Sequence, residues 1–154
     1  MLRKLYERVS GAFDTGNPER PEGDPDASLA LATAVLMVDV ARADSDFSPE
    51  EFDRVVTLAT RHFGLTADEA AELANRADET AEELVSLHEF TQLLHTRLDE
   101  NQKAEVVRLL WRVAYADGRL DMYEDALVLR ISDLLHVSRG LVMRLKHDAA
   151  PEAS

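Results

Sequence analysis

The stretch LMVDVARADSDFSPEEFDRVVTL at residues 36–58 sets an acidic loop between two segments whose apolar residues have helical spacing. It occurs a second time as LLWRVAYADGRLDMYEDALVLRI at residues 109–131, so that each position lies 73 residues (117 − 44) after its counterpart. Seven aligned pairs are identical: Leu36/Leu109, Val40/Val113, Ala41/Ala114, Ala43/Ala116, Asp44/Asp117, Glu51/Glu124 and Val55/Val128. The repeat predicts a domain with two related helical halves, and its fixed carboxylates suggest a shared acidic site.

Composition narrows the class of protein. The chain has 154 residues, of which 45% are hydrophobic and 31% charged, as is typical of one globular domain with a sizeable core. Its net charge of −13 repels phosphate backbones, so we expect no nucleic-acid partner. The sequence contains no cysteine, which excludes disulfides and thiolate metal sites.

No signal peptide or membrane span is expected from the sequence. The first residues, MLRKLYERVSGAF, lack the apolar core of a signal peptide. The longest apolar stretch, Leu29 to Val38, is too short to cross a bilayer. We therefore expect a cytoplasmic protein.

Two regions are predicted along the chain, an N-terminal segment over 1–25 and a helical domain over 26–150. Apolar residues in 1–13 recur with helical spacing, and the same segment carries three basic residues, Arg3, Lys4 and Arg8. Residues 14–25 are rich in proline, glycine and acidic residues, which is typical of a linker. The amphipathic segment is expected to dock on its own domain or on a protein partner, or at most to contact a membrane peripherally.

The domain is predicted to be all-α, with about seven helices. Apolar periodicity places them near 27–43, 49–63, 67–78, 81–98, 100–116, 122–136 and 139–148. Three of the starts carry an N-cap residue followed three positions later by a glutamate, at Ser48, Thr66 and Asp121. Gly64 and Gly118 stand where helices should end, because glycine readily adopts the left-handed conformation of a helix stop.

Carboxylates in the two acidic loops are the candidate metal ligands. One set is Asp44, Asp46 and Glu51, and the other is Asp117, Asp121 and Glu124. Carboxylates without sulfur ligands favour hard cations, here Ca2+, Mg2+ or Mn2+, bound in two sites or in one shared site. Neither loop is an EF-hand, because the twelfth position counted from each first aspartate is a valine, Val55 or Val128.

Helix capping is the competing interpretation of these carboxylates. Glu51, Asp121 and Glu124 stand where side-chain oxygens cap the amides of a helix start. Asp44 and Asp117 differ, because each follows an apolar helix whose negative end disfavours another anion by a few tenths to about 1 kcal/mol. An Asx turn, a basic residue or a cation would offset that cost.

Two further sets of polar residues invite a functional interpretation. Asp39 and Arg112 occupy equivalent positions within the apolar stretches, so they are predicted either to pair near the pseudo-two-fold axis or to be half-exposed with unrelated neighbours. His88 and His95 are seven residues apart, which is longer than the usual four-residue zinc pair, so ordinary helix-face positions are expected. Trp111 is predicted to lie in the core or at its rim.

The stretches ARADSDFSPEE and VAYADGRLDMYEDALVLRISDLLHVS resemble the TerB-like family, which is named for tellurite resistance. The stretch LHEFTQLLHTRL, followed by LLWRVAYADG, is similar to a largely uncharacterised bacterial branch of that family. The resemblance covers about residues 29–147. It implies an all-helical domain with two pseudo-symmetric halves, suspected binding of divalent cations by acidic residues, and a role in stress-response assemblies near the membrane. The first copy departs from the family pattern at Ser45 and Ser48, so the second copy holds the fuller acidic set.

Sequence motifs of catalysis do not occur. The chain has no nucleophile elbow, phosphate-cradling glycine loop or dinucleotide fingerprint, so we expect a protein that is not an enzyme. The leading hypothesis is a non-catalytic TerB-like domain that binds divalent cations and works through protein partners. The alternatives are a purely structural interaction module, whose acidic loops only cap helices, and a metal-dependent hydrolase.

Overall fold

The computed structural model describes residues 25–43, 48–83, 87–116, 118 and 120–150. Within these ranges every regular element is a helix, which confirms the predicted all-α class. The helices are α2 (Pro25–Ala41), α3 (Pro49–Phe63), α4 (Ala67–Glu83), α5 (His88–Arg97), α6 (Glu100–Ala114), α7 (Met122–Leu134) and α8 (Arg139–Ala149). The helix predicted over 1–13 and its linker lie outside the described residues.

Helix boundaries follow the capping signals where the sequence has them. Thr66, for example, accepts a hydrogen bond from the Glu69 amide at 3.2 Å, and Glu69 accepts one from the Thr66 amide at 2.9 Å. Gly64 and Gly118 have φ values of 65° and 81°, as their predicted place at helix ends requires.

The predicted boundary between the helices over 67–78 and 81–98, which correspond to α4 and α5, is wrong. α4 runs to Glu83 rather than to residue 78, and α5 begins at His88 rather than at 81. No proline or glycine interrupts this segment, and Thr80 Oγ1 donates to the Arg76 carbonyl at 2.8 Å within the extended helix. Ala81 packs against the core, so burial favours the extra turn.

The repeat seen in the sequence is also visible in the order of helices. α2 ends at Ala41 and α6 at Ala114, while α3 begins at Pro49 and α7 at Met122, and both pairs are 73 residues apart (114 − 41 and 122 − 49). α2 packs on both α3 and α4, as α6 packs on both α7 and α8. Each half is therefore a three-helix unit, and α5 lies between the two units in the chain.

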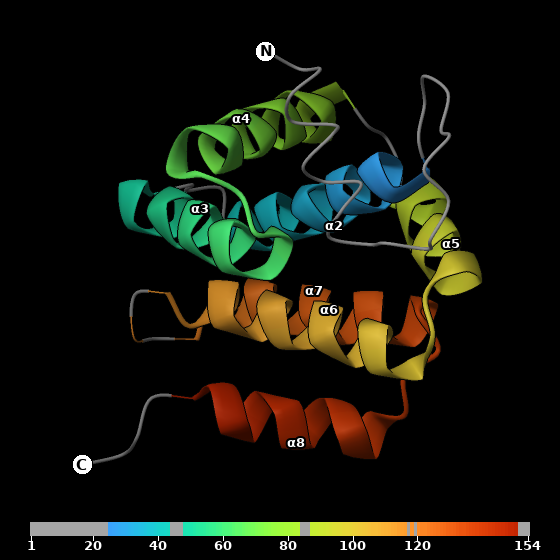
Figure 1. Ribbon diagram of the computed structural model, residues 1–154. Coiled ribbons are helices and arrows are strands. Elements are labelled where there is room, and N and C mark those ends of the chain that lie inside the picture. The colour runs from blue at the N-terminus through green and yellow to red at the C-terminus, as the bar shows by residue number, and fades with distance from the viewer. Residues whose placement is uncertain (1–24, 44–47, 84–86, 117, 119, 151–154) are drawn as a thin grey trace.

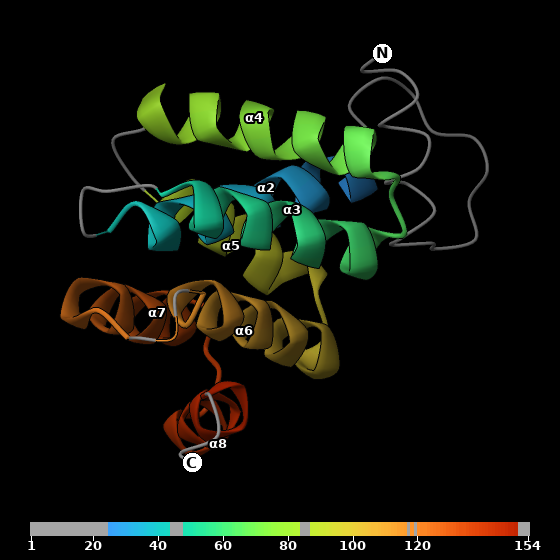
Figure 2. The ribbon, with the colours of Figure 1, turned by 90° about the vertical axis from the view of Figure 1, so that its left-hand side faces the viewer.

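The halves stack in layers, with α4 at one end of the molecule and α8 at the other (Figures 1 and 2). α2 runs through the middle, and from Leu29 to Ala41 nearly all of its residues are buried, which is why that helix is apolar on every side. Leu36, Met37 and Trp111 are among the largest fully buried side chains. Among the described helices, none has both the length and the apolar character needed to cross a membrane.

Candidate functional site

The start of α3 forms a complete capping box. Ser48 Oγ accepts a hydrogen bond from the Glu51 amide at 3.1 Å, and Glu51 Oε1 accepts from the Ser48 amide at 3.4 Å and from its hydroxyl at 3.1 Å. Pro49 occupies the first turn, where no amide hydrogen is needed. The capping interpretation of Glu51 is thus confirmed, and its side chain is only 5% exposed.

The start of α7 is built in a similar way in the second half. Asp121 Oδ2 accepts from the amides of Tyr123 at 2.8 Å and Glu124 at 3.1 Å, which confirms the predicted N-cap. Glu124 stands 73 residues after Glu51, and it is equally buried, at 4% exposure. Each acidic loop therefore leads into a helix whose first turn carries one buried glutamate.

The predicted metal ligands are only partly within the described residues. Asp44, Asp46 and Asp117 lie outside them, so neither predicted set is complete in the structure. Glu51, Asp121 and Glu124 are placed, and all three sit in first turns or caps. Among the described side chains alone, no group of three or more histidine, aspartate or glutamate residues is positioned to hold a metal ion.

Asp39 and Arg112 do not pair. Arg112 is exposed, and no hydrogen bond or ion pair joins these two described residues. Burial raises the pKa of Asp39 from 3.8 to about 6, and the charge of Arg42, three residues later, opposes that rise. Arg42 in turn forms an ion pair of 2.9 Å with Asp78, which connects the end of α2 to α4. The carboxylate in the apolar stretch therefore interacts with its own half of the domain.

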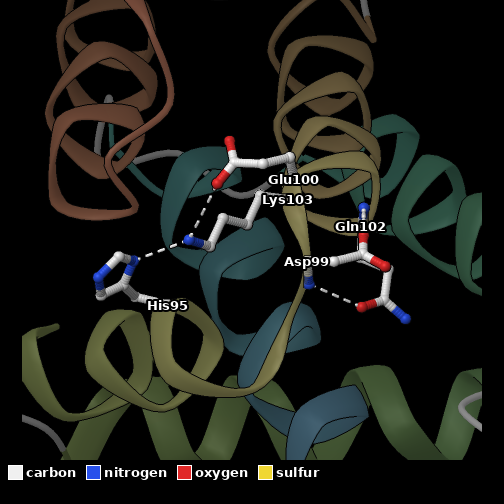
Figure 3. A network of polar contacts seen from close by, with 5 residues as sticks. All are labelled: His95, Asp99, Glu100, Gln102 and Lys103. Atoms are coloured by element: carbon white, nitrogen blue, oxygen red, sulfur yellow. Dashed lines mark hydrogen bonds and ion pairs between the residues drawn. The ribbon is translucent and has the colours of Figure 1, made fainter.

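A cluster of basic side chains joins α5, α6 and the turn after α7, and the sequence interpretation missed it. Lys103 is only 4% exposed, and its Nζ lies 2.8 Å from His95 Nδ1 and 3.8 Å from Glu100 Oε1 (Figure 3). The His95 ring also stacks on His136, with centroids 4.2 Å apart and planes tilted by 33°. His95 was predicted to take an ordinary position on a helix face. Its contacts with Lys103 and His136 give it a structural role in addition.

The cluster fixes one tautomer of His95. An ammonium group can only donate, so His95 Nδ1 must accept and its ring proton must be on Nε2. The first turn that carries Lys103 is held by a capping box between Asp99 and Gln102, with hydrogen bonds of 2.8 and 2.9 Å. A sequence signal for this cluster does exist, because Lys103 lies on the same helical stripe as buried Val106, Val107 and Leu110.

Trp111 anchors the last helix to α6. It is fully buried, as predicted, and its Nε1 donates to the carbonyl of Val142 in α8 at 3.1 Å. Lys146 lies 5.3 Å from the centre of the Trp111 ring and forms an ion pair of 2.6 Å with Asp125. α8 is thus held by one buried hydrogen bond and by two ion pairs, Lys146–Asp125 and the exposed Arg139–Asp133, in addition to its apolar contacts.

These features define an all-α domain of two related three-helix halves, each with an acidic junction between a loop and a helix. The family model described as tellurite resistance protein TerB matches residues 30–147. Because this match covers most of the chain, the chain belongs to the TerB family. No curated protein matches it.

One solved structure supports the fold independently. The crystal structure of a protein of unknown function from Porphyromonas gingivalis is similar, with 24% sequence identity and a TM-score of 0.58. The match covers 79% of this chain and 88% of that one. At this level of identity the likeness establishes the arrangement of helices only.

Proposed function

We propose that this TerB-family domain is a non-catalytic module that binds a divalent cation at its acidic junctions and acts through protein partners in stress-response assemblies. The observation that carries the proposal is the equal burial of Glu51 and Glu124 at equivalent positions. Two halves that have diverged at most other positions keep a shielded carboxylate in the first turn after an acidic loop. The family description, tellurite resistance, supports the stress-response setting.

The chemistry of the donors favours a hard cation. A buried carboxylate interacts more strongly with a cation than an exposed one does, because less water screens the charges. Oxygen donors without sulfur favour Ca2+, Mg2+ or Mn2+. In the second copy Asp117, Asp121 and Glu124 would contribute, and in the first copy Asp44, Asp46 and Glu51 would do so.

A metal-dependent melting experiment tests the proposal. The full chain is melted with and without millimolar Ca2+, Mg2+ or Mn2+, because a ligand that binds only the folded state raises Tm. We expect a rise with one of these ions that is reduced by Asp117→Asn and by Glu124→Gln. Asp68→Asn, at an exposed position on α4, is the matched control and should keep the full rise.

A second candidate function is a structural interaction module without metal. The specific observation that favours it is the set of hydrogen bonds by which Ser48, Glu51 and Asp121 cap their helices. In that case none of the three ions changes Tm, and Asp117→Asn leaves the stability as in the natural sequence. A metal-dependent increase in hydrolysis of model esters or phosphates would instead favour the hydrolase alternative.

A further inference from the structure

α8 forms the outermost layer of the second half, and one of its faces has no neighbour within the described chain. Val142 and Leu145 point into the core, while Gly140, Met143, Arg144, His147 and Asp148 are all exposed. These five residues fall on one side of the helix, because their spacing follows the period of 3.6 residues per turn. We call them the outer face of α8. Figures 1 and 2 show α8 at the opposite end of the molecule from α4.

The large exposed apolar side chains of the described residues all lie on α7 and α8. They are Met122, Tyr123 and Met143, which are 74%, 63% and 42% exposed. Met122 precedes Asp125 by one turn on α7, Met143 precedes Lys146 by one turn on α8, and Asp125 and Lys146 form an ion pair. Met143 is the one of these that lies on the outer face of α8, and methionine adapts its shape readily to a contacting surface.

Charge is distributed unevenly between the two ends of the molecule. α4 has seven acidic residues and one basic residue, which gives a formal charge of −6. α8 has three basic residues, Arg139, Arg144 and Lys146, and one acidic residue, Asp148, which gives +2 in a chain whose net charge is −13. Two copies that meet through α8 would keep their α4 helices at the two far ends, where repulsion between them is weakest.

We propose that two copies of this chain pair about a two-fold axis through the outer faces of α8, with the two helices antiparallel. A two-fold contact must be self-complementary, so each residue needs its partner type on the same face. Arg144 and Asp148 satisfy this requirement, because an axis near residues 144–147 places Arg144 of each copy beside Asp148 of the other.

One local feature agrees with this pairing. In the structure neither Arg144 nor Asp148 forms an ion pair with another described residue, and a basic residue four positions before an acidic one is the less favourable order within a helix.

A charge-swap series tested by analytical ultracentrifugation decides the proposal. The full chain should show a concentration-dependent monomer–dimer equilibrium with no larger species. Arg144→Glu should raise the dimer Kd about tenfold or more, because a two-fold interface contains each pair twice. Combining Arg144→Glu with Asp148→Arg should restore the Kd to within a few-fold of the starting value. Helical circular dichroism of each variant at low concentration checks that the fold is intact.

Single-cysteine variants locate the contact, since the natural chain has no cysteine to interfere. With a short bis-maleimide, Met143→Cys should be captured as a covalent dimer, whereas Asn75→Cys, exposed on α4, should not. A chain that stays monomeric at every concentration would overturn the proposal. So would a dimer that is indifferent to Arg144→Glu, or a head-to-tail series of larger species in which Asn75→Cys is captured as readily as Met143→Cys.

Discussion

Lys103 Nζ lies 2.8 Å from Nδ1 of His95, and this contact joins a nearly buried ammonium group on α6 to a ring on α5. It lies in the part of the chain that connects the two halves, because α5 follows the first three-helix unit and α6 begins the second. The His95 ring extends the link by stacking on His136 in the turn after α7. The junction between the halves is therefore partly polar, although the core on either side is apolar.

Removing the two partners of this contact should have unequal effects on stability. His95→Ala removes the nearest acceptor of the nearly buried Lys103 ammonium and leaves only the longer 3.8 Å contact with Glu100, so we expect a loss of roughly 2–4 kcal/mol in the free energy of unfolding. Lys103→Met keeps the shape and removes the charge, so a change of less than about 1.5 kcal/mol is expected. Urea unfolding at neutral pH measures both. Equal losses for the two variants would show that the ammonium does not depend on His95.

The helix caps should contribute similar amounts in the two halves. Ser48→Ala and Asp121→Ala each remove a side-chain acceptor of first-turn amides, and each should lower the free energy of unfolding by about 0.5–2 kcal/mol. Thr66→Ala tests the third predicted cap and should fall in the same range. Chemical denaturation of the three variants provides the comparison. If Asp121→Ala does not lower the free energy of unfolding measurably, the Asp121 carboxylate does not stabilise the start of α7, and the prediction is wrong.

Asp39→Asn should stabilise the protein in a pH-dependent way. The pKa of Asp39 is raised from 3.8 to about 6 in the folded protein, so the folded state binds its proton more tightly than the unfolded state does. Its contribution to stability is therefore fully present below pH 3.8 and is lost as the pH rises to about 6. At neutral pH the substitution removes a half-buried charge and should add on the order of 1 kcal/mol after allowing for solvent screening.

Urea unfolding of the natural chain and of Asp39→Asn, at neutral pH and near pH 4, measures this effect. The difference between the two proteins should shrink as the pH falls toward 4, because the natural carboxyl group is then protonated in the folded protein. Asp53→Asn, at an exposed position on α3, serves as the control and should show a smaller change with pH. The same difference at both pH values would contradict the raised pKa.

Trp111→Phe should weaken the attachment of α8 more than the rest of the fold. The substitution removes the donor of the 3.1 Å hydrogen bond to the Val142 carbonyl and leaves that buried oxygen without it. We expect a loss of about 1–3 kcal/mol in global stability. Hydrogen exchange should show the largest increase in rate within Arg139–Ala149. Exchange that accelerates equally in α2 and α8 would argue against this local anchor.

The sequence predicts the helices well because their ends carry explicit chemistry. Ser48 and Asp121 cap the helices that they were expected to cap, and Gly64 and Gly118 have the positive φ values of helix ends. The boundary between α4 and α5 was misplaced because no proline or glycine marks it, so packing of the last turn of α4 decides where that helix ends.

The site was less predictable, since it depends on how helices are rotated against one another. Equivalent positions in the repeat left open whether Asp39 and Arg112 pair or have unrelated neighbours. The second alternative holds for their neighbours, because Arg112 faces solvent and Asp39 is influenced by nearby Arg42. Lys103 and His95 are only eight residues apart, yet they meet because the chain turns between α5 and α6. Periodicity assigns a residue to a face of a helix and does not specify which residue of a neighbouring helix it contacts.

Calorimetric titration of divalent cations into the full chain tests the proposed function most directly. We expect saturable binding of Ca2+, Mg2+ or Mn2+ that is abolished or weakened by Asp117→Asn combined with Glu124→Gln, while Asp68→Asn binds as the natural chain does. The stronger effect should come from the second copy, where the acidic set is fuller. Absence of saturable binding for all three ions, with the folded state confirmed by circular dichroism, would contradict the account and leave the buried glutamates as parts of helix starts.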